Sequence, residues 1–286
     1  MSIQISTNID SLKAQNQLSK ISTSLSKSFE KLSSGLRINT ASDDPAGLAM
    51  ANKLMADARI ANTAIRNAND GVSIAAIADS AMNEIGSILM RMGELAEQSA
   101  NGTYTNTQRS ALSLEFTALG SEINRIAATT SFNSINLLSN SSSIVLQVGL
   151  DGSSSSQISI TSVTATLDSL GLATSGSSAL SFSIIANTTS DAQSSAQNAL
   201  TAINSAITSL SSKRGTLGAV ESRLTSAINS LTSARENFLA AESRIRDADI
   251  AAEVANMVRL QVLQQSTMAV IAQANQQPAR ILSLLN

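Results

Sequence analysis

The sequence predicts a mainly α-helical protein: a long antiparallel helical bundle with a small β-hairpin region, whose terminal helices pair as a coiled coil. Three observations support this fold class. Apolar residues recur at helical spacing along most of the chain, and only two prolines occur in 286 residues. Both ends carry apolar stripes, whereas residues 139–190 are polar and rich in Ser and Thr. Apolar surfaces at the termini are typical of a subunit that polymerises.

The amino-terminal stripe fills residues 1–40. From Leu18 to Leu36 its apolar residues are spaced by three, four, four, three and four positions. Steps of three, four and four sum to eleven, the repeat of a nearly straight helix pair. Lys13, Lys20 and Lys27 fall on one flank, where we interpret them as a solvated face. The residues expected to pack within or between subunits are Ile9, Leu12, Leu18, Ile21, Leu25, Phe29, Leu32 and Leu36.

A long helix is expected after this stripe. Gly35 and residues 39–45 break the first pattern, Asp43 or Asp44 can cap the next helix, and Pro45 suits its first position. A helix from there to about residue 100 is roughly 80 Å long. Gly71 is expected to weaken it slightly. The dipeptide 101–102 (NG) predicts a turn, and a second helix follows over about 105–129.

The second half of the chain begins with strand signals. Residues 144–148 and 157–160 predict two strands, and 179–186 a third. Helical pattern resumes near 191 and continues to about 246, and a last helix spans about 247–284, with Pro278 expected to kink it or loosen its end. The packing residues expected on the last helix are Val254, Met257, Ile271, Ile281 and Leu285.

The bundle helices and the terminal helices differ in where they can bury their apolar stripes. The helices 45–100, 105–129 and 191–246 can form an antiparallel bundle by themselves. The two terminal helices can pair only with each other or with neighbouring copies. Because one helix pair buries only part of the apolar surface, we expect the termini to be loose in the isolated chain and to order on assembly.

Composition excludes several functions. The chain has no Cys and no His, which removes His-dependent triads, Cys–His pairs and most zinc sites. We therefore expect no enzyme activity, no catalytic residue, no cofactor and no metal. A net charge of −2 and few aromatic residues argue against nucleic-acid binding. No stretch reaches transmembrane length and the start does not read as a signal peptide, so we expect no membrane partner.

Motifs at both ends resemble one family, bacterial flagellin. At the amino end these are residues 32–39 (LSSGLRIN), 41–47 (ASDDPAG) and 68–73 (ANDGVS). At the carboxyl end they are 242–249 (ESRIRDAD), 253–257 (EVANM), 261–265 (QVLQQ), 272–276 (AQANQ) and 282–285 (LSLL). The resemblance implies a structural subunit that polymerises into the bacterial flagellar filament for swimming motility. The alternative is the hook–filament junction protein, a hook-associated protein with similar terminal motifs.

The resemblance also implies a domain plan. Residues 1–44 and 245–286 would form the inner coiled-coil domain with its connecting spoke. Residues 45–165 and 190–244 would form the helical bundle with the β-hairpin, and 166–189 a residual variable outer segment. For the Ser- and Thr-rich stretch 139–190, a plain polar loop and a carrier of O-linked glycans both stay open.

Partners and location follow from the same resemblance. They are the chain itself as a helical homopolymer, a flagellar export chaperone, the filament cap and hook-associated proteins. The subunit would be exported by the flagellar type III apparatus without a cleaved signal peptide. Arg91, Leu95 and Glu115 match a surface recognised by a host Toll-like receptor, although Gly93 stands where a basic residue is frequent. In the alternative interpretation Leu95 packs between helices and the surface makes subunit contacts.

Overall fold

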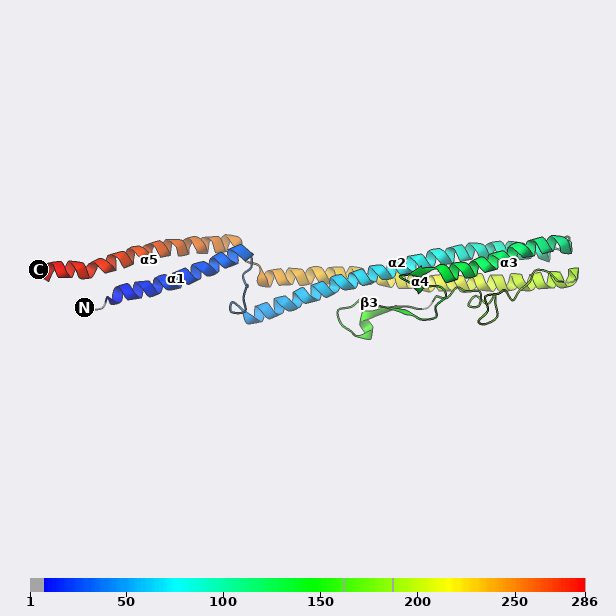
Figure 1. Cartoon of the computed structure of the whole chain (residues 1–286), viewed down its shortest axis with the longest axis horizontal. Coiled ribbons are helices and arrows are strands. Elements are labelled where there is room, and N and C mark those ends of the chain that lie inside the picture. The colour runs from blue at the N-terminus through cyan, green and yellow to red at the C-terminus, as the bar shows by residue number, and fades with distance from the viewer. Residues whose placement is uncertain (1–7, 162, 187, 286) are drawn as a thin grey trace. The chain divides into compact units, whose positions relative to one another are not determined.

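The computed structural model describes residues 8–161, 163–186 and 188–285, with side chains up to residue 276. The chain divides into two compact units: Met1–Ala58 with Glu236–Asn286, and Arg59–Arg235. Figure 1 shows the helices and strands of both units. The predicted fold class is confirmed, because the chain is mainly helical, carries small antiparallel strand pairs and packs its terminal helices together.

The first unit is built on α1 (Ile9–Ser34) and α5 (Ile250–Leu285). The Asn8 side chain caps α1 by accepting from the Ser11 backbone N–H at 3.0 Å. Gly35 ends α1 with φ 71°, a left-handed conformation that favours glycine. Beyond it, Leu36 forms a single antiparallel bridge with Asp247, and the Ala248 N–H donates to the Gly35 carbonyl at 2.9 Å. Backbone pairing therefore joins the two connections that lead out of α1 and into α5.

The turn before α2 (Pro45–Ala100) assigns separate roles to the two adjacent aspartates. Asp44 Oδ1 accepts from the Gly47 N–H at 2.9 Å and so caps the helix, with Pro45 in its first position. Asp43 Oδ2 instead accepts from the Thr40 N–H at 3.0 Å and the Asn39 N–H at 3.2 Å. The helix therefore begins where the sequence predicts.

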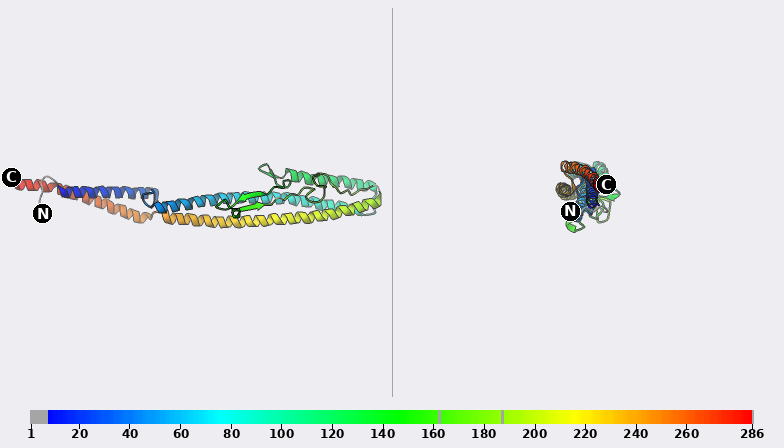
Figure 2. Two further views of the ribbon diagram at one scale, coloured as in Figure 1. Left: turned by 90° about the horizontal axis from the view of Figure 1, so that it is seen from below. Right: turned by 90° about the vertical axis from the view of Figure 1, so that its left-hand side faces the viewer.

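The second unit packs α2, α3 (Asn106–Thr129) and α4 (Thr189–Arg246) lengthwise. Figure 2 shows α2 and α4 running side by side, with the strands to one side of them. A capping box starts α3: Thr105 and Gln108 each bond the other's backbone N–H. The core between the helices holds Met82, Ile85, Leu89, Phe116, Ile123, Ile203 and Leu210, all at most 3% exposed.

Two antiparallel strand pairs lie between α3 and α4. The first is β1 (Ser131–Phe132) with β2 (Ile135–Asn136). The second is β3 (Ile144–Gln147) with β4 (Gln157–Ile160), joined by a loop that contains the short 3-10 helix η1 (Ser154–Ser156). Ile144 pairs with Ile160, and Gln147 with Gln157. The two strands expected over 144–148 and 157–160 are confirmed.

The third strand expected over 179–186 is wrong. In its described residues this segment has only one isolated bridge, between Leu180 and Ala173. Within the segment, the Ile184 carbonyl accepts from Ser99 Oγ of α2 at 2.6 Å and the Ser181 N–H donates to the Leu172 carbonyl at 2.9 Å. Just before it, the Ser178 carbonyl accepts from Asn124 Nδ2 of α3 at 2.6 Å. Because these bonds satisfy backbone groups on the segment, Ile184 reaches the core without a partner strand.

Gly71 has a different role from the one predicted. A Cβ at this position would clash with Leu146 of β3 and lie 3.1 Å from Leu224 Cδ1 of α4. The missing side chain allows the hairpin and α4 to approach α2 closely at this point. Glycine destabilises the interior of α2, but here it also lets α2, β3 and α4 pack more closely.

Candidate subunit interface

The inner face of the terminal helix pair follows a strict seven-residue repeat. On α1 the buried or half-buried positions include 11, 14, 18, 21, 25, 28 and 32, and on α5 they include 253, 257, 260, 264, 267, 271 and 274; positions 31, 256 and 261 are half-buried beside this repeat. Alternating steps of three and four residues define a heptad pattern. The eleven-residue interpretation of α1 fails because Ser28, 2% exposed, takes the inner position that the apolar pattern gave to Phe29.

The predicted packing residues separate into two groups. Ile21 is buried, and Leu18, Leu25, Leu32, Leu36, Met257 and Ile271 are half-buried on or beside the inner face. Four others, Ile9, Leu12, Phe29 and Val254, are exposed in the single chain. The side chains of Ile281 and Leu285 lie outside the described residues. Ala274, which follows the three-and-four spacing of the last helix, is buried, and so is Leu260, which apolar periodicity did not identify.

Polar side chains join α1 to α5 near both ends of the pair. Ser28 Oγ donates to Glu253 Oε1 at 2.6 Å and accepts from Asn256 Nδ2 at 3.2 Å. Ser11 Oγ donates to Asn275 Oδ1 at 2.7 Å. The sequence contained a signal for these contacts, since Ser11 and Ser28 stand in heptad register with Leu18, Ile21 and Leu25.

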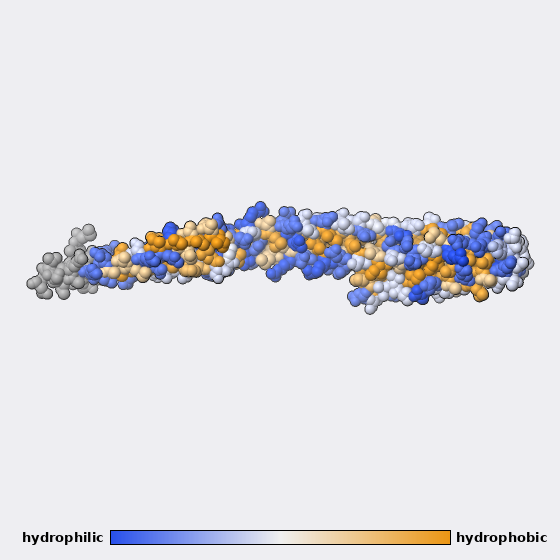
Figure 3. All heavy atoms as spheres, turned by 90° about the horizontal axis from the view of Figure 1, so that it is seen from above, coloured by the Kyte–Doolittle hydropathy of each residue, from blue (hydrophilic) through white to orange (hydrophobic). Residues whose placement is uncertain are grey.

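The outer faces of the same two helices remain apolar. The large exposed apolar residues are Ile9, Leu12, Phe29, Ile250, Val254, Val258, Val262, Leu263, Met268 and Val270. Figure 3 shows a continuous apolar stretch on one face of the terminal helix pair. Contiguous apolar surface of this kind is typical of a protein–protein interface. The four exposed residues of the predicted packing set thus have the character of an interface between chains.

The three residues matched to a receptor surface occupy neighbouring positions on α2 and α3. Arg91 Nε contacts Glu115 Oε1 at 2.8 Å, and Arg91 Nη1 contacts Glu94 Oε2 at 2.8 Å. The hydrogen bond to Glu115, followed by that to Glu94, raises the pKa of Arg91 above its ordinary value. Leu95 is 0% exposed and belongs to the core. The surface therefore presents Arg91 and Glu115, with Leu95 beneath it.

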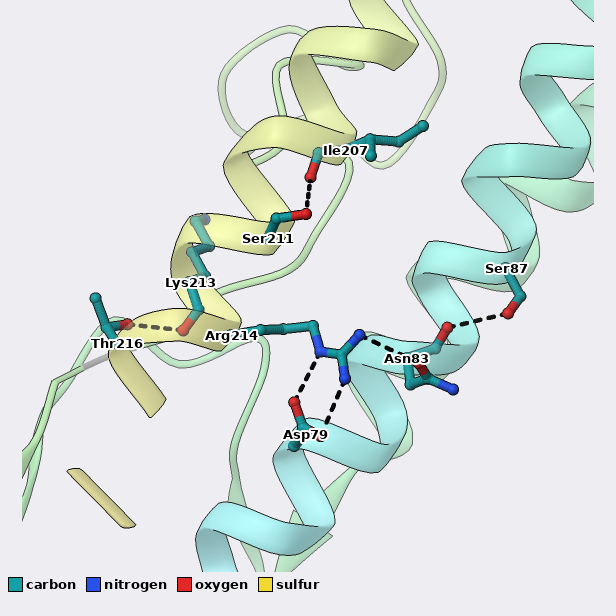
Figure 4. Close-up of polar contacts among 8 residues, drawn as sticks. All are labelled: Asp79, Asn83, Ser87, Ile207, Ser211, Lys213, Arg214 and Thr216. Carbon is teal, nitrogen blue, oxygen red and sulfur yellow. Dashed lines mark hydrogen bonds and ion pairs between the residues drawn. The ribbon is translucent and has the colours of Figure 1, made fainter. Parts of the chain in front are cut away.

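Two adjacent basic residues of α4 hold different neighbours. Arg214 forms a two-point ion pair with Asp79 of α2, from Nε to Oδ1 at 2.8 Å and from Nη2 to Oδ2 at 3.2 Å, and also contacts Asn83 (Figure 4). The Asp79 hydrogen bond raises the pKa of Arg214. Lys213 Nζ donates to the Thr164 and Ser169 carbonyls, and burial lowers its pKa. This turn of α4 therefore fixes both α2 and the segment after β4.

A buried arginine fastens the end of the second unit where α2 turns into α3. Arg109 is 0% exposed; its Nη2 donates to the Asn101 carbonyl at 2.9 Å and its Nη1 to the Thr189 carbonyl at 3.3 Å. Its Nε is buried without a partner among the described atoms. The cation lies beside the carboxyl end of α2, where helix carbonyls favour positive charge. Sequence reasoning missed this residue because nothing in the local pattern marks it.

Among the described residues, no three His, Cys, Asp or Glu side chains gather as metal ligands would.

The expectation that no stretch is suited to cross a membrane needs correction, since α2 is long and apolar enough by length and composition. One such helix is weak support for a membrane span, because core helices pass the same test, and a third of this window is buried within the protein.

Long helices, a heptad-packed terminal pair and apolar outer faces define a self-associating structural protein. Comparison with known proteins gives its family. Residues 5–143 match the family model described as "Bacterial flagellin N-terminal helical region", and residues 200–285 match "Bacterial flagellin C-terminal helical region". The chain belongs to the bacterial flagellin family.

Two flagellin sequences match almost the whole chain. A flagellin of Halalkalibacterium halodurans is 40% identical over 91% of this chain and 91% of its own length. A flagellin of Listeria monocytogenes is 35% identical over 99% of this chain and 100% of its own. The crystal structure of Bacillus cereus flagellin matches 58% of this chain and 88% of its own with 27% identity and a TM-score of 0.48.

The function follows from the family. The protein is a structural subunit of the extracellular bacterial flagellar filament and assembles with copies of itself. Nothing in the comparisons supports the hook–filament junction alternative. Flagellins are structural proteins, which is consistent with the expectation of no enzyme activity.

Proposed function

We propose that the terminal helix pair is the inner subunit-to-subunit interface of the filament. The observation that carries this proposal is the division of its apolar residues: one set packs α1 on α5, and a second set, including Val258 and Val262, faces outward. Ile281 and Leu285 continue the pattern in the sequence of α5. Burying the outward set between copies would supply the hydrophobic free energy of assembly.

One substitution tests this interface without disturbing the helix pair. Val262 is 59% exposed, so Val262→Glu adds a charge to the outer face and leaves the inner packing intact. We expect the purified chain to keep its helicity by circular dichroism but to form no filaments from seeds. The matched control, Gln265→Glu, adds the same charge at a polar exposed position three residues away and should assemble. Normal filaments from Val262→Glu would contradict the proposal.

Truncation gives a coarser test of the same interface. The α4 helix ends at Arg246 and α5 begins at Ile250, so removing 247–286 deletes α5 and leaves the second unit's helices complete. The shortened chain should be a soluble, largely helical monomer. Filament formation by this variant would refute a role for α5. Hydrogen exchange on the full-length monomer would test whether the termini order only on assembly: strong protection of α1 amides would reject that expectation.

The domain plan forms part of this proposal. Residues 1–44 with 245–286 serve as the inner domain, 45–165 with 190–244 as the surrounding bundle, and 166–189 as a reduced outer segment. The pairing of residues 35–37 with 246–248 supports a structured connection rather than a free linker. Leu167, Leu170, Leu172 and Ile184 are buried in the second unit's core, which supports a short outer segment held close to the bundle.

Export is the second part of the proposal. The subunit leaves the cell through the flagellar type III apparatus without signal cleavage, bound beforehand by an export chaperone and placed by the filament cap onto hook-associated proteins. The exposed apolar face of α5 supports a chaperone, since such a surface needs cover before assembly. Intact mass measurement of filament protein should show that nothing beyond the first Met is removed. Loss of a longer amino-terminal segment would exclude this route.

A host Toll-like receptor is a further proposed partner of Arg91 and Glu115. Both side chains are almost half exposed and hold each other in place, which supports a preformed polar surface, while Leu95 packs beneath it. Arg91→Ala and Glu115→Ala should each reduce activation of receptor-bearing cells by monomeric protein. Arg125→Ala, on the same helix as Glu115 but away from this pair, is the control. Equal activation by all variants would exclude the surface.

A further inference from the structure

The turn between α2 and α3 contains the only Asn–Gly dipeptide of the chain, Asn101 with Gly102. Both residues are exposed to solvent. Glycine has no Cβ, so its backbone nitrogen is sterically open to the side-chain amide carbon of the asparagine that precedes it. Among the described residues the Gly102 N–H makes no hydrogen bond. This backbone nitrogen is therefore unhindered and open to water.

The Asn101 side-chain amide is held and polarised by Thr103. Asn101 Oδ1 accepts from the Thr103 N–H at 3.1 Å and from Thr103 Oγ1 at 3.1 Å. Donors on a carbonyl oxygen stabilise the negative charge that the oxygen gains when a nucleophile adds to the carbon. Thr103 thus supplies two donors for an addition at Asn101 Cγ.

The main-chain carbonyl of Asn101 contacts a buried cation. Its oxygen accepts from Arg109 Nη2 at 2.9 Å and from the Tyr104 N–H at 3.4 Å. Arg109 is 0% exposed, makes no ion pair within the described part of the chain, and has a buried Nε without a partner there. A buried charge without a counter-charge is unfavourable, so a negative charge on the Asn101 carbonyl oxygen would be stabilised at this position.

We propose that Asn101 is a modification site, at which the folded chain deamidates without an enzyme and Arg109 directs the product to isoaspartate. Hydroxide removes the Gly102 amide proton, and the nitrogen bonds to Asn101 Cγ. The Cγ–Nδ2 bond breaks, Nδ2 takes up protons from water, and ammonia leaves behind a succinimide ring. Water then adds to the main-chain carbon of Asn101, and the bond from this carbon to the Gly102 nitrogen breaks. The net change is the uptake of one water and the release of one ammonia.

Arg109 favours this route before and after the ring opens. Its hydrogen bond withdraws electrons from the main-chain carbon that water attacks and from the Gly102 amide whose proton must leave. In isoaspartate the chain continues through Cγ, and the former main-chain carbonyl becomes a carboxylate on the oxygen that Arg109 already contacts. Opening of the ring at Cγ would give ordinary aspartate and leave that carbonyl uncharged. The buried guanidinium therefore gains an ion pair only from isoaspartate.

The modification goes beyond the filament function and does not depend on it, because every group involved belongs to the second unit. It adds a negative charge and one backbone methylene to the turn that Arg109 fastens. Water does not reverse the loss of ammonia, so the modified fraction should rise with the time since the subunit folded.

A second Asn–Gly site in the same chain gives a matched control. Ser134→Gly creates it after Asn133, in the exposed turn between β1 and β2, where a φ of 65° favours glycine. In the part of the chain that the structure describes, no arginine bonds Asn133. This variant is incubated in one mildly alkaline buffer, folded or unfolded by denaturant. Peptide mapping by mass spectrometry then measures asparagine, aspartate and isoaspartate at both sites.

The two sites should differ only in the folded chain. Unfolded, Asn101 and Asn133 should react at similar rates, since each precedes a glycine. Folded, Asn101 should react about tenfold faster than Asn133, because its hydrogen bonds stabilise the developing charges. Its share of isoaspartate should also exceed the share in the unfolded chain. An Asn101 that reacts no faster than Asn133, or an unchanged isoaspartate share, would overturn the proposal.

Substitutions separate the roles of the neighbouring residues. Thr103→Ala removes one donor at an exposed position and should slow the loss of Asn101 by about fivefold. Thr107→Ala, at another exposed position, is the control and should leave the rate unchanged. Arg109→Met, used only if circular dichroism shows it folded, should return the isoaspartate share to that of the unfolded chain. Equal rates in the two threonine variants would overturn the proposal, and this comparison needs neither Arg109→Met nor filaments.

Discussion

Ser28 of α1 donates a 2.6 Å hydrogen bond to the carboxylate of Glu253 on α5, across 225 residues of sequence. Both residues occupy inner heptad positions, where an apolar pair would otherwise be expected. A polar pair in such a seam disfavours every other alignment of the two helices, since sliding by one heptad would leave Glu253 facing an apolar residue. The contact therefore specifies the register of the terminal helix pair.

Removing this contact should loosen the pair. Ser28→Ala leaves the half-buried Glu253 carboxylate without its shortest hydrogen bond, at an expected cost of about 1–3 kcal/mol. In assembled filaments, where the pair is ordered, hydrogen exchange of the α1 amides should become faster by a corresponding factor. Ser26→Ala is the matched control, because the exposed Ser26 hydroxyl bonds only within its own helix. Equal exchange in the two variants would show that Ser28 does not set the register.

Arg109 should be the most sensitive basic residue of the second unit. Arg109→Met keeps the bulk but removes the guanidinium hydrogen bonds to the Asn101 and Thr189 carbonyls, so we expect a loss of about 2–5 kcal/mol in the free energy of unfolding. Arg125→Met, which breaks only an exposed pair with Glu122, should cost less than about 1 kcal/mol. Denaturant unfolding of the full chain, followed by proteolysis at the α2–α3 turn, measures both variants. Similar losses in the free energy of unfolding for the two variants would exclude the role of Arg109 in holding the α2–α3 turn against α4.

Periodicity and end signals predicted the elements because they are local. Pro45, Gly35 and the 101–102 turn place helix ends, and alternation over 157–160 places a strand. These features depend on residues within one turn or one strand, which the sequence displays directly. The family motifs then identified the function.

The remaining features depend on contacts between distant segments. In the sequence Ser28 is a polar interruption of the apolar stripe, but in the structure it bonds Glu253. Arg109 has the pattern of a surface cation, but in the structure it bonds the Thr189 carbonyl at the start of α4. The resemblance placed Leu95 on a receptor surface, yet its side chain faces the core. The segment 179–186 has strand composition, but its Ile184 carbonyl accepts a hydrogen bond from Ser99 of α2. Tertiary context overrides local preference in each case.

Gly71 is predicted to tolerate no side chain. Gly71→Ala removes a glycine from a helix interior, which ordinarily stabilises by about 0.5–1 kcal/mol, but here the methyl group meets Leu146 and Leu224. We expect a net loss of about 1–3 kcal/mol from overpacking. Gly215→Ala and Gly218→Ala, also within a helix but with no atom within 4 Å of the added Cβ, should gain stability. Thermal unfolding of the three variants compares them, and a stabilised Gly71→Ala would mean that the hairpin moves aside freely.

Asp43 should make the turn before α2 sensitive to acid. Hydrogen bonds from the Thr40 N–H, then from the Asn39 N–H and the Thr40 hydroxyl, hold the pKa of Asp43 below its ordinary value. A carboxylate with a lowered native pKa stabilises the fold fully above its unfolded pKa of about 3.9, and this contribution disappears as pH falls through the native value. Amide exchange at residues 39–44 should therefore increase below about pH 3.9 in the natural chain. In Asp43→Asn the exchange should already be fast at neutral pH and, once corrected for intrinsic rates, nearly independent of pH, because no charge remains to be lost. An acid response that persists in Asp43→Asn would show that the transition does not come from Asp43.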